Sequence, residues 1–129
     1  MLDTHFVATV EFGVNRLICD LANDLNKVLG CALSEEKTGQ FDEIPAFVGH
    51  TKDVSIILFG PTEEYRGRGC VLEISYSSEL TPEEARCAAP TIFRSVFFGT
   101  YEELTGYINC SVELEGVLRG MGFSDCHVA

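Results

Sequence analysis

Carboxylates are the side chains in this sequence with the greatest capacity for chemistry, because 20 Asp and Glu residues stand against 9 Lys and Arg residues in a chain of 129. The formal net charge is -11. A field of this sign repels nucleic acid and anionic membranes and attracts cationic surfaces. The composition therefore predicts a basic protein as the partner, with no direct contact to nucleic acid or membrane. Many of the carboxylates form adjacent pairs: Glu35–Glu36, Asp42–Glu43, Glu63–Glu64, Glu83–Glu84 and Glu102–Glu103.

Two of these pairs lie beside an aromatic residue in segments that we expect to be loops at the edges of a sheet. Phe41 precedes the Asp42–Glu43 pair. Tyr65 follows the Glu63–Glu64 pair. A carboxylate pair next to an aromatic ring suits contact with a basic cleft, because the carboxylates can pair with its cations and aromatic side chains anchor interfaces. We therefore predict a partner-binding site made of Phe41, Asp42, Glu43, Glu63, Glu64 and Tyr65.

Two other acidic pairs occur in patterns typical of helix starts. Thr81-Pro82-Glu83-Glu84 is a capping box with proline at the first helical position, and Thr100-Tyr101-Glu102-Glu103 repeats the box without proline. Negative charge in the first turn of a helix is stabilised by the macrodipole by about 0.3 to 1 kcal/mol. These two pairs are therefore predicted to serve helix formation, and the second helix should extend to about Gly120.

The sequence contains none of the common catalytic signatures. G-x-S-x-G, P-loop, G-x-G-x-x-G and H-E-x-x-H motifs are all absent, so we predict no catalytic residue and no cofactor. Of the three histidines, His50 could act as a general base oriented by Asp53. A polar hairpin residue is the simpler interpretation of His50, because no nucleophile lies nearby in sequence. An enzyme with a dispersed active site stays open as an alternative.

Six cysteines would suit disulfides in a secreted protein. The first residues, however, lack the basic start and apolar stretch of a signal peptide, and the longest apolar runs are far too short to span a bilayer. We therefore expect a cytoplasmic protein with six reduced thiols. There is no C-x-x-C, and Cys126–His127 has no further ligands at zinc-binding spacing, so no metal site is predicted.

An amphipathic helix is expected near the N-terminus. Apolar residues recur with helical spacing over residues 14–29, and Gly30 supplies a C-terminal stop. Residues 4–12 either continue this helix backward or form a separate first strand, since Gly13 lies between the two segments.

The middle of the chain predicts an antiparallel sheet of three or four strands. β-like runs occur at residues 31–33, 44–49, 54–59 and 70–76, with short connections. Because residues 56–59 are all apolar, we expect Ile57 to be buried in a central strand that is covered on both faces.

Helices are expected again after the sheet. Pro90 ends the helix that starts at Thr81, and residues 91–98 suit either helical turns or a strand. The order N-terminal helix, antiparallel sheet, C-terminal helices indicates a single α+β domain over residues 1–129.

In size, acidity and aromatic-flanked acidic loops, the sequence resembles small acidic bacterial toxin-immunity proteins of the contact-dependent growth inhibition type. This resemblance implies a non-catalytic protein that neutralises a nuclease toxin. Such a toxin has a basic groove, to which an acidic inhibitor is steered and where its carboxylates replace phosphates. Two other classes stay open: an acidic secretion chaperone or adaptor, which would expose apolar grooves and form a homodimer, and the small enzyme.

Overall fold

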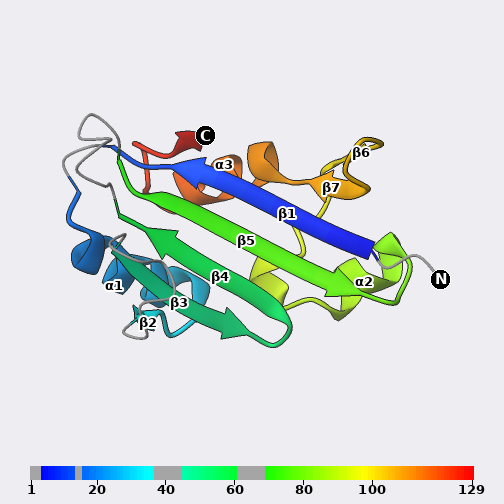
Figure 1. Ribbon diagram of the computed structural model, residues 1–129, viewed down its shortest axis with the longest axis horizontal. Helices are drawn as coiled ribbons and strands as arrows, with labels where there is room; N and C mark the ends of the chain where they lie inside the picture. The colour runs from blue at the N-terminus through cyan, green and yellow to red at the C-terminus, as the bar shows by residue number, and fades with distance from the viewer. Residues whose placement is uncertain (1–3, 14–15, 37–44, 61–68) are drawn as a thin grey trace.

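A computed structural model describes residues 4–13, 16–36, 45–60 and 69–129. Within them the chain forms three α-helices and one mixed sheet of eight strands (Figure 1). The helices are α1 (Ile18–Leu29), α2 (Pro82–Ala88), the short 3₁₀ helix η2 (Thr91–Phe93) and α3 (Ser111–Gly120). The strands are β1 (Thr4–Glu11), β2 (Ser34–Glu35), β3 (Ala46–Thr51), β4 (Val54–Phe59), β5 (Val71–Ser78), β6 (Thr100–Glu102), β7 (Tyr107–Asn109) and β8 (His127–Val128). The predicted α+β class is confirmed, although the order and number of elements differ.

The strands follow the order β2-β3-β4-β5-β1-β7-β6, and β8 also pairs with β1. Pairing is antiparallel except between β1 and β7, which run parallel. The three α-helices lie behind the sheet in Figure 1. Alternate residues of β1, β4 and β5 are buried, so the core lies between the helices and one face of the sheet. No described helix covers the other face.

Residues 4–11 form the central strand β1, which decides between the two alternatives left by the sequence. Phe6, Ala8 and Val10 are buried and alternate with partly exposed residues, as expected for a strand with one covered face. The predicted N-terminal helix is therefore preceded by a strand. The sheet also exceeds the predicted three or four strands, because β1, β6 and β7 come from segments for which helix was predicted or left open.

The edge of β1 that faces away from β5 is completed by separate pieces of the C-terminal half. The Cys110 N–H donates to the Val7 carbonyl (2.7 Å), and the Ala129 N–H donates to the Thr9 carbonyl (3.5 Å). Between them the Thr9 N–H donates to Ser111 Oγ (2.9 Å), 102 residues away in sequence. The buried Ser111 hydroxyl thus satisfies a backbone donor at the point where α3 begins and the strand pairing is interrupted.

Helix α1 follows the predicted apolar spacing and ends where the sequence indicated. Leu21 and Leu25 are fully buried, as expected for the apolar face that this spacing predicts. Gly30 ends the helix with a left-handed φ of 61°. The helix starts at Ile18 rather than at residue 14, and residues 14–15 lie outside the described part of the chain.

Strand β4 has the predicted bounds, but the prediction for Ile57 was wrong. Ile56 and Leu58 are fully buried against the helix side, whereas Ile57 is only partly buried. Ile57 lies opposite Glu73 of β5, on the face that none of the described helices covers. An uninterrupted apolar run is compatible with one covered face as well as with two.

The first capping box folds as predicted. Thr81 Oγ1 accepts a hydrogen bond from the Glu84 N–H (3.3 Å) and donates to the Glu84 carboxylate (2.8 Å). Pro82 occupies the first turn of α2, and Ala85 is buried beneath it. The sequence pattern therefore located the start of α2 correctly.

The second capping box does not start a helix. Thr100 opens β6, and α3 begins only at Ser111, so the predicted helix was wrong over residues 100–110. Leu104 and Tyr107, which the helical spacing placed on a buried face, are exposed. Pairing of β7 with the edge of β1 overrides the local helical signal, because it supplies hydrogen-bond partners to both strands.

Residues 91–98 form helical turns rather than a strand. The Phe97 N–H donates to the Phe93 carbonyl (3.1 Å) after η2. The Phe93 ring stacks on Phe97, which in turn stacks on Phe6 and Tyr76, with centroids 4.7 to 5.8 Å apart. In the described part of the chain, no helix has both the length and the apolar character needed to cross a bilayer.

Candidate protein-interaction surface

The six residues that the sequence predicted to bind a partner lie outside the described residues: Phe41, Asp42, Glu43, Glu63, Glu64 and Tyr65. The described residues that flank the two segments meet at one end of the sheet. The Gly60 N–H donates to the Pro45 carbonyl (2.8 Å), and the Glu36 N–H donates to the Ala46 carbonyl (2.8 Å). Both acidic segments are therefore joined to the fold at the same place, beside β3 and β4.

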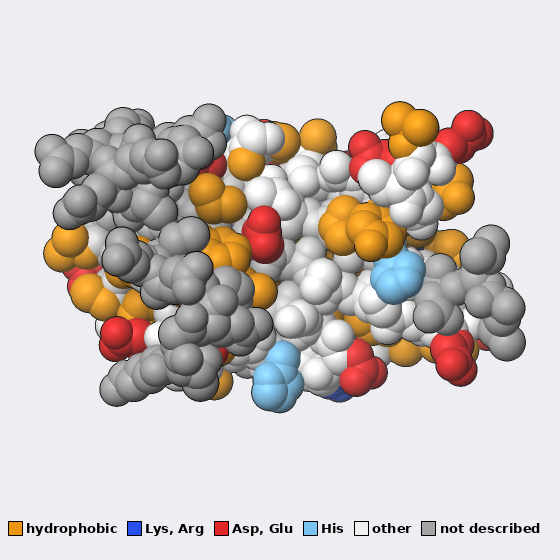
Figure 2. All heavy atoms as spheres, in the orientation of Figure 1, with side chains coloured by type: hydrophobic (Ala, Val, Ile, Leu, Met, Phe, Trp, Pro, Cys, Tyr) orange, Lys and Arg blue, Asp and Glu red, His pale blue; other side chains and the backbone are white. Residues whose placement is uncertain are grey.

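The face of the sheet opposite the helices carries small hydroxyl groups and aliphatic side chains. Figure 2 looks onto this face, where white and orange side chains predominate and one red carboxylate stands near the middle. We call this surface the open face, and it is formed by His5, Val7, Thr9 and Glu11 of β1, by Ser55, Ile57 and Phe59 of β4, and by Val71, Glu73, Ser75 and Ser77 of β5. It is an accessible platform with little charge of its own.

Glu73 lies in the middle of the open face. Thr9 of β1 and Ile57 of β4 are directly opposite it, and these residues line a shallow hollow of about 210 Å³ together with Ser55 and Ser75. Glu73 is exposed, and its carboxylate has no hydrogen bond or ion pair with another described residue. This arrangement offers a single carboxylate acceptor, surrounded by hydroxyls and methyl groups, to a cation from outside the chain.

His5 and Ser77 form the closest approach to a catalytic pair. Ser77 Oγ is 2.6 Å from His5 Nδ1, and the His5 ring lies against Tyr107, with centroids 5.2 Å apart. A serine beside a histidine could act as a nucleophile with its general base. Ser77 is exposed and His5 is partly exposed on the β1–β5 strand pair, and within the described residues no carboxylate orients His5. The pair also has the simpler role of a cross-strand contact between β1 and β5.

His50, which the sequence analysis interpreted as a polar hairpin residue in preference to a general base, lies on β3 near the β3–β4 turn. It is exposed and lies opposite Ser55 in the strand pairing. His127 of β8 contacts the Glu11 carboxylate of β1 (3.4 Å), and strands β4 and β5 lie between β1 and the strand that carries His50. The described histidines are thus dispersed rather than gathered into one site.

The β6–β7 hairpin, residues 100–109, carries exposed apolar and acidic side chains together. Tyr101 is 60% exposed, Tyr107 is 41% exposed and Leu104 at the tip is fully exposed. Glu102 and Glu103 lie between them, and their carboxylates make no hydrogen bond or ion pair within the described residues. Figure 2 shows orange and red side chains side by side over this end of the sheet. The hairpin therefore has the same composition, a carboxylate pair beside aromatic rings, that marked the two predicted loops.

The arginines of the described chain are held by the fold. Each guanidinium donates a hydrogen bond to a carboxylate or backbone carbonyl: Arg16 to Asp125, Arg86 to Phe97, Arg94 to Ala89 and Arg119 to Cys126. Glu73, Glu102 and Glu103, by contrast, have free carboxylates among the described residues. Among the described residues, the arginines are therefore held by the fold and Lys27 and Lys52 are not, while these three carboxylates remain open as acceptors for a cationic partner.

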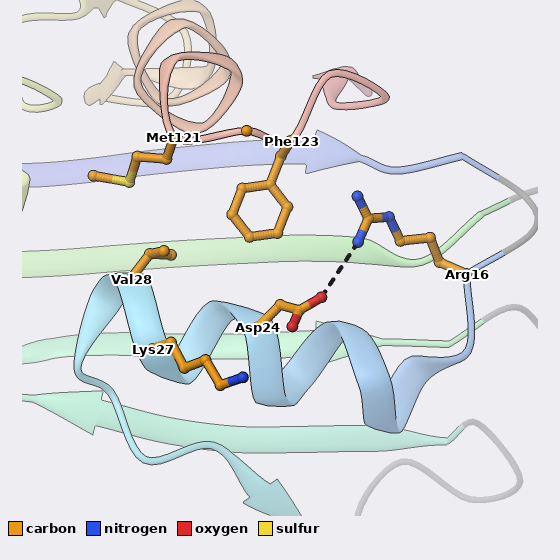
Figure 3. Close-up of a pocket in the computed structure, with 7 residues that line it drawn as sticks. Arg16, Asp24, Lys27, Val28, Met121 and Phe123 are labelled. Carbon is orange, nitrogen blue, oxygen red and sulfur yellow. Dashed lines mark ion pairs between the residues drawn. The ribbon is translucent and has the colours of Figure 1, made fainter.

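A pocket of about 250 Å³ lies between α1 and the segment that follows α3 (Figure 3). Arg16 donates two hydrogen bonds to the Asp125 carboxylate (2.8 and 3.0 Å) and pairs with Asp24 at 3.6 Å. The hydrogen bonds between Arg16 and Asp125 raise the pKa of Arg16 and lower the pKa of Asp125. The Asp125 carboxylate also accepts from the Gly13 N–H (3.0 Å). The charges of Arg16, Asp24 and Asp125 are therefore paired with one another. They link the N-terminal part of the chain to its C-terminal segment and leave no ion site open among these three residues.

All six cysteines are free thiols. Four are buried, and burial raises the pKa of Cys110 to about 11 and that of Cys126 to about 12. A thiol with so high a pKa stays protonated near neutral pH and is a poor nucleophile or metal ligand. Within the described residues, no group of three or more His, Cys, Asp or Glu side chains could hold a metal ion.

Comparisons of the chain with protein-family models, with curated proteins and with solved structures gave no match.

Proposed function

We propose that this chain is a non-catalytic binding protein that neutralises a basic protein partner, in the manner of a bacterial immunity protein that inhibits a nuclease toxin. The observation that carries the proposal is the unequal use of charge: the described arginines bond within the fold, whereas the carboxylates of Glu73, Glu102 and Glu103 are free. A basic nuclease groove supplies the cations that these acceptors lack, and the net charge of -11 accelerates the encounter.

Two features of the fold support a protein rather than a small molecule as the ligand. The open face has a shallow hollow of about 210 Å³, and a wider one of about 640 Å³ lies beside Ser55 and His50. Both are open to the surface, whereas small-molecule sites are concave and enclose most of the ligand. The two acidic segments with Phe41 and Tyr65 are joined to one end of that sheet. We expect a partner to cover this end of the sheet and the adjoining open face.

The test is a titration of nuclease activity. The candidate partners are purified basic DNase and RNase toxin domains, including the product of any toxin gene next to the gene for this chain. We expect each chain to inactivate one nuclease molecule, so that activity falls linearly to zero at equimolar ratio. Association should slow as salt concentration rises, since long-range attraction between the two proteins is screened.

Charge reversal locates the contact. Replacing Asp42, Glu43, Glu63 and Glu64 with lysine should weaken the complex, whereas Glu83→Lys, in the first turn of α2, should change folding stability more than binding. Unchanged affinity after reversal of all four loop carboxylates, or an acidic partner, would show that the inhibitor proposal is wrong.

A hydrolase is the second candidate function, and the contact between Ser77 and His5 favours it. A fluorophosphonate probe should label Ser77 if this pair is an activated nucleophile, and His5→Ala should abolish the labelling. Under the inhibitor proposal we expect no labelling of Ser77.

A further inference from the structure

Exposed large apolar side chains are concentrated around one short hairpin. The described residues include nine of them, and four lie within residues 98–107: Phe98, Tyr101, Leu104 and Tyr107. Isolated apolar side chains are ordinary on protein surfaces, but a cluster at one projecting element is typical of an interaction site. Leu104 adds nothing to the core, because its side chain is fully exposed.

The tip that carries Leu104 is held in one conformation by local hydrogen bonds. The Gly106 N–H donates to the Glu102 carbonyl (2.8 Å), and the Tyr107 N–H donates to Thr105 Oγ1 (3.1 Å). Gly106 adopts a left-handed φ of 76°, which favours glycine at that turn position. A preformed tip loses little conformational entropy when it binds.

The hairpin is also joined firmly to the sheet. Ile108 pairs with Phe6 of β1, and the Tyr107 ring packs against His5 of the open face. At the base of the hairpin its two sides lie close together, since a Cβ atom at Gly99 would be 2.0 Å from the Asn109 carbonyl oxygen. The apolar tip is therefore a rigid projection that continues the open face.

Charge defines the surface that this projection fits. Residues 95–118 contain four glutamates and no lysine, arginine or histidine. Two of these glutamates, Glu102 and Glu103, stand directly beside Leu104, with carboxylates that no described residue binds. The complementary surface has an apolar pocket for the leucine and cationic side chains at the rim.

We propose that the β6–β7 hairpin is the anchor through which the chain binds its protein partner, with Leu104 inserted into an apolar pocket whose rim is formed by lysine or arginine side chains. This inference rests on the proposed function, since it assumes a basic protein partner. The sequence pattern had suggested helix formation as the role of this segment. The proposal instead assigns partner binding to its exposed residues: Tyr101, Glu102, Glu103, Leu104 and Tyr107.

The probe is a random peptide library displayed on phage and selected on the immobilised full chain. We expect the enriched peptides to combine lysine or arginine with apolar residues. Leu104→Ser should weaken their binding by about tenfold or more, the scale of a lost interface anchor. Glu102→Gln with Glu103→Gln should weaken it mainly at low salt.

Leu17→Ser is the matched control, because Leu17 is also largely exposed (66%) and lies outside the hairpin, at the start of α1. It should leave peptide binding unchanged. The urea midpoint should change little in Leu104→Ser and should not fall in Leu17→Ser, where serine is a favourable N-cap residue, so this measurement shows that both variants remain folded.

The outcomes separate the two proposals. Cationic peptides that bind Leu104→Ser as tightly as the unaltered chain would overturn the hairpin anchor and leave the basic partner intact. Enrichment of peptides without cationic residues would overturn the basic partner itself. Equal losses in Leu17→Ser and Leu104→Ser would show a general effect of surface leucines and would also overturn the anchor.

Discussion

Thr81–Glu84 and Thr100–Glu103 share the same threonine and glutamate pattern, yet one caps helix α2 and the other opens the β6–β7 hairpin. In the first segment, Pro82 fixes the first helical position and Ala85 packs into the core one turn later. In the second, Leu104 faces solvent and Gly106 reverses the chain. A capping pattern thus produces a helix where the following residues have a core to face, and not where an unpaired strand edge offers the backbone other partners.

The largest expected effect tests the same distinction between local pattern and placement within β4. Leu58→Ala should lower the free energy of unfolding by about 2 to 5 kcal/mol, because Leu58 is fully buried. Ile57→Ala, one residue away on the open face, should cost only about 1 kcal/mol, the upper range of a cross-strand contact. Urea denaturation of both variants measures the difference. Equal losses would mean that the open face is covered.

The base of the β6–β7 hairpin can be disrupted by a substitution at Gly99. Gly99→Ala places a Cβ atom 2.0 Å from the Asn109 carbonyl oxygen and should cost about 1 to 3 kcal/mol, since backbone must shift. Gly116→Ala in α3 is the control of opposite sign: its Cβ meets nothing within 4 Å, so it should stabilise the helix by about 0.5 to 1 kcal/mol. Thermal denaturation of both variants measures these two changes in stability. A stable Gly99→Ala would contradict the close approach of Gly99 to Asn109 at the base of the hairpin.

The two threonines provide the most direct test of the comparison. Thr81→Ala removes a helix cap and should cost about 0.5 to 2 kcal/mol. Thr100→Ala alters an exposed strand residue and should change stability by less than about 0.5 kcal/mol. Urea unfolding curves give both values. A loss of similar size at Thr100 would indicate a capping role that the hairpin conformation does not provide.

The cysteines near the two segments differ in accessibility, and labelling can test this difference in the folded protein. Cys87 on α2 is exposed, whereas burial raises the pKa of Cys110, which follows β7, to about 11. At about pH 8, iodoacetamide should modify Cys87 and the exposed Cys19 in the folded protein, and all six thiols after denaturation. Mass spectrometry counts the adducts. Fewer than six in the denatured, non-reduced protein would reveal a disulfide.

The raised pKa values of Cys110 and Cys126 predict how the stability of the fold changes at alkaline pH. A thiol whose pKa is higher in the folded state than its ordinary 9.0 stabilises the fold fully below pH 9. This contribution is lost as the pH rises through about 11 for Cys110 and about 12 for Cys126. Denaturation midpoints should therefore fall above pH 9, and less steeply in Cys126→Ala.

Features encoded by nearby residues were predicted from the sequence, and features that depend on distant partners were not. The end of α1 at Gly30, the start of α2 at Thr81 and the bounds of β4 follow from local spacing and capping. β7 forms because β1 has a free edge to which it can pair, which no local pattern reveals. For the candidate site, the rule that found Phe41 and Tyr65 also fits Tyr101 beside Glu102–Glu103, but the capping pattern outweighed it.

The hydrogen bonds that complete β1 have a consequence for the order of events during synthesis. The hydrogen bond from the Gly13 N–H to the Asp125 carboxylate joins residues that are 112 positions apart. A ribosome adds about 5 to 20 residues per second, so Asp125 is synthesised about 5 to 20 s after Gly13. β5 is complete at Ser78 and β7 at Asn109, so for about 2 to 6 s of this interval β1 can pair with β5 while its other edge has neither β7 nor β8. A nascent chain of this kind presents an unpaired strand edge to its neighbours on the same messenger RNA, and we expect its yield to depend on translation speed and on chaperones that bind such edges.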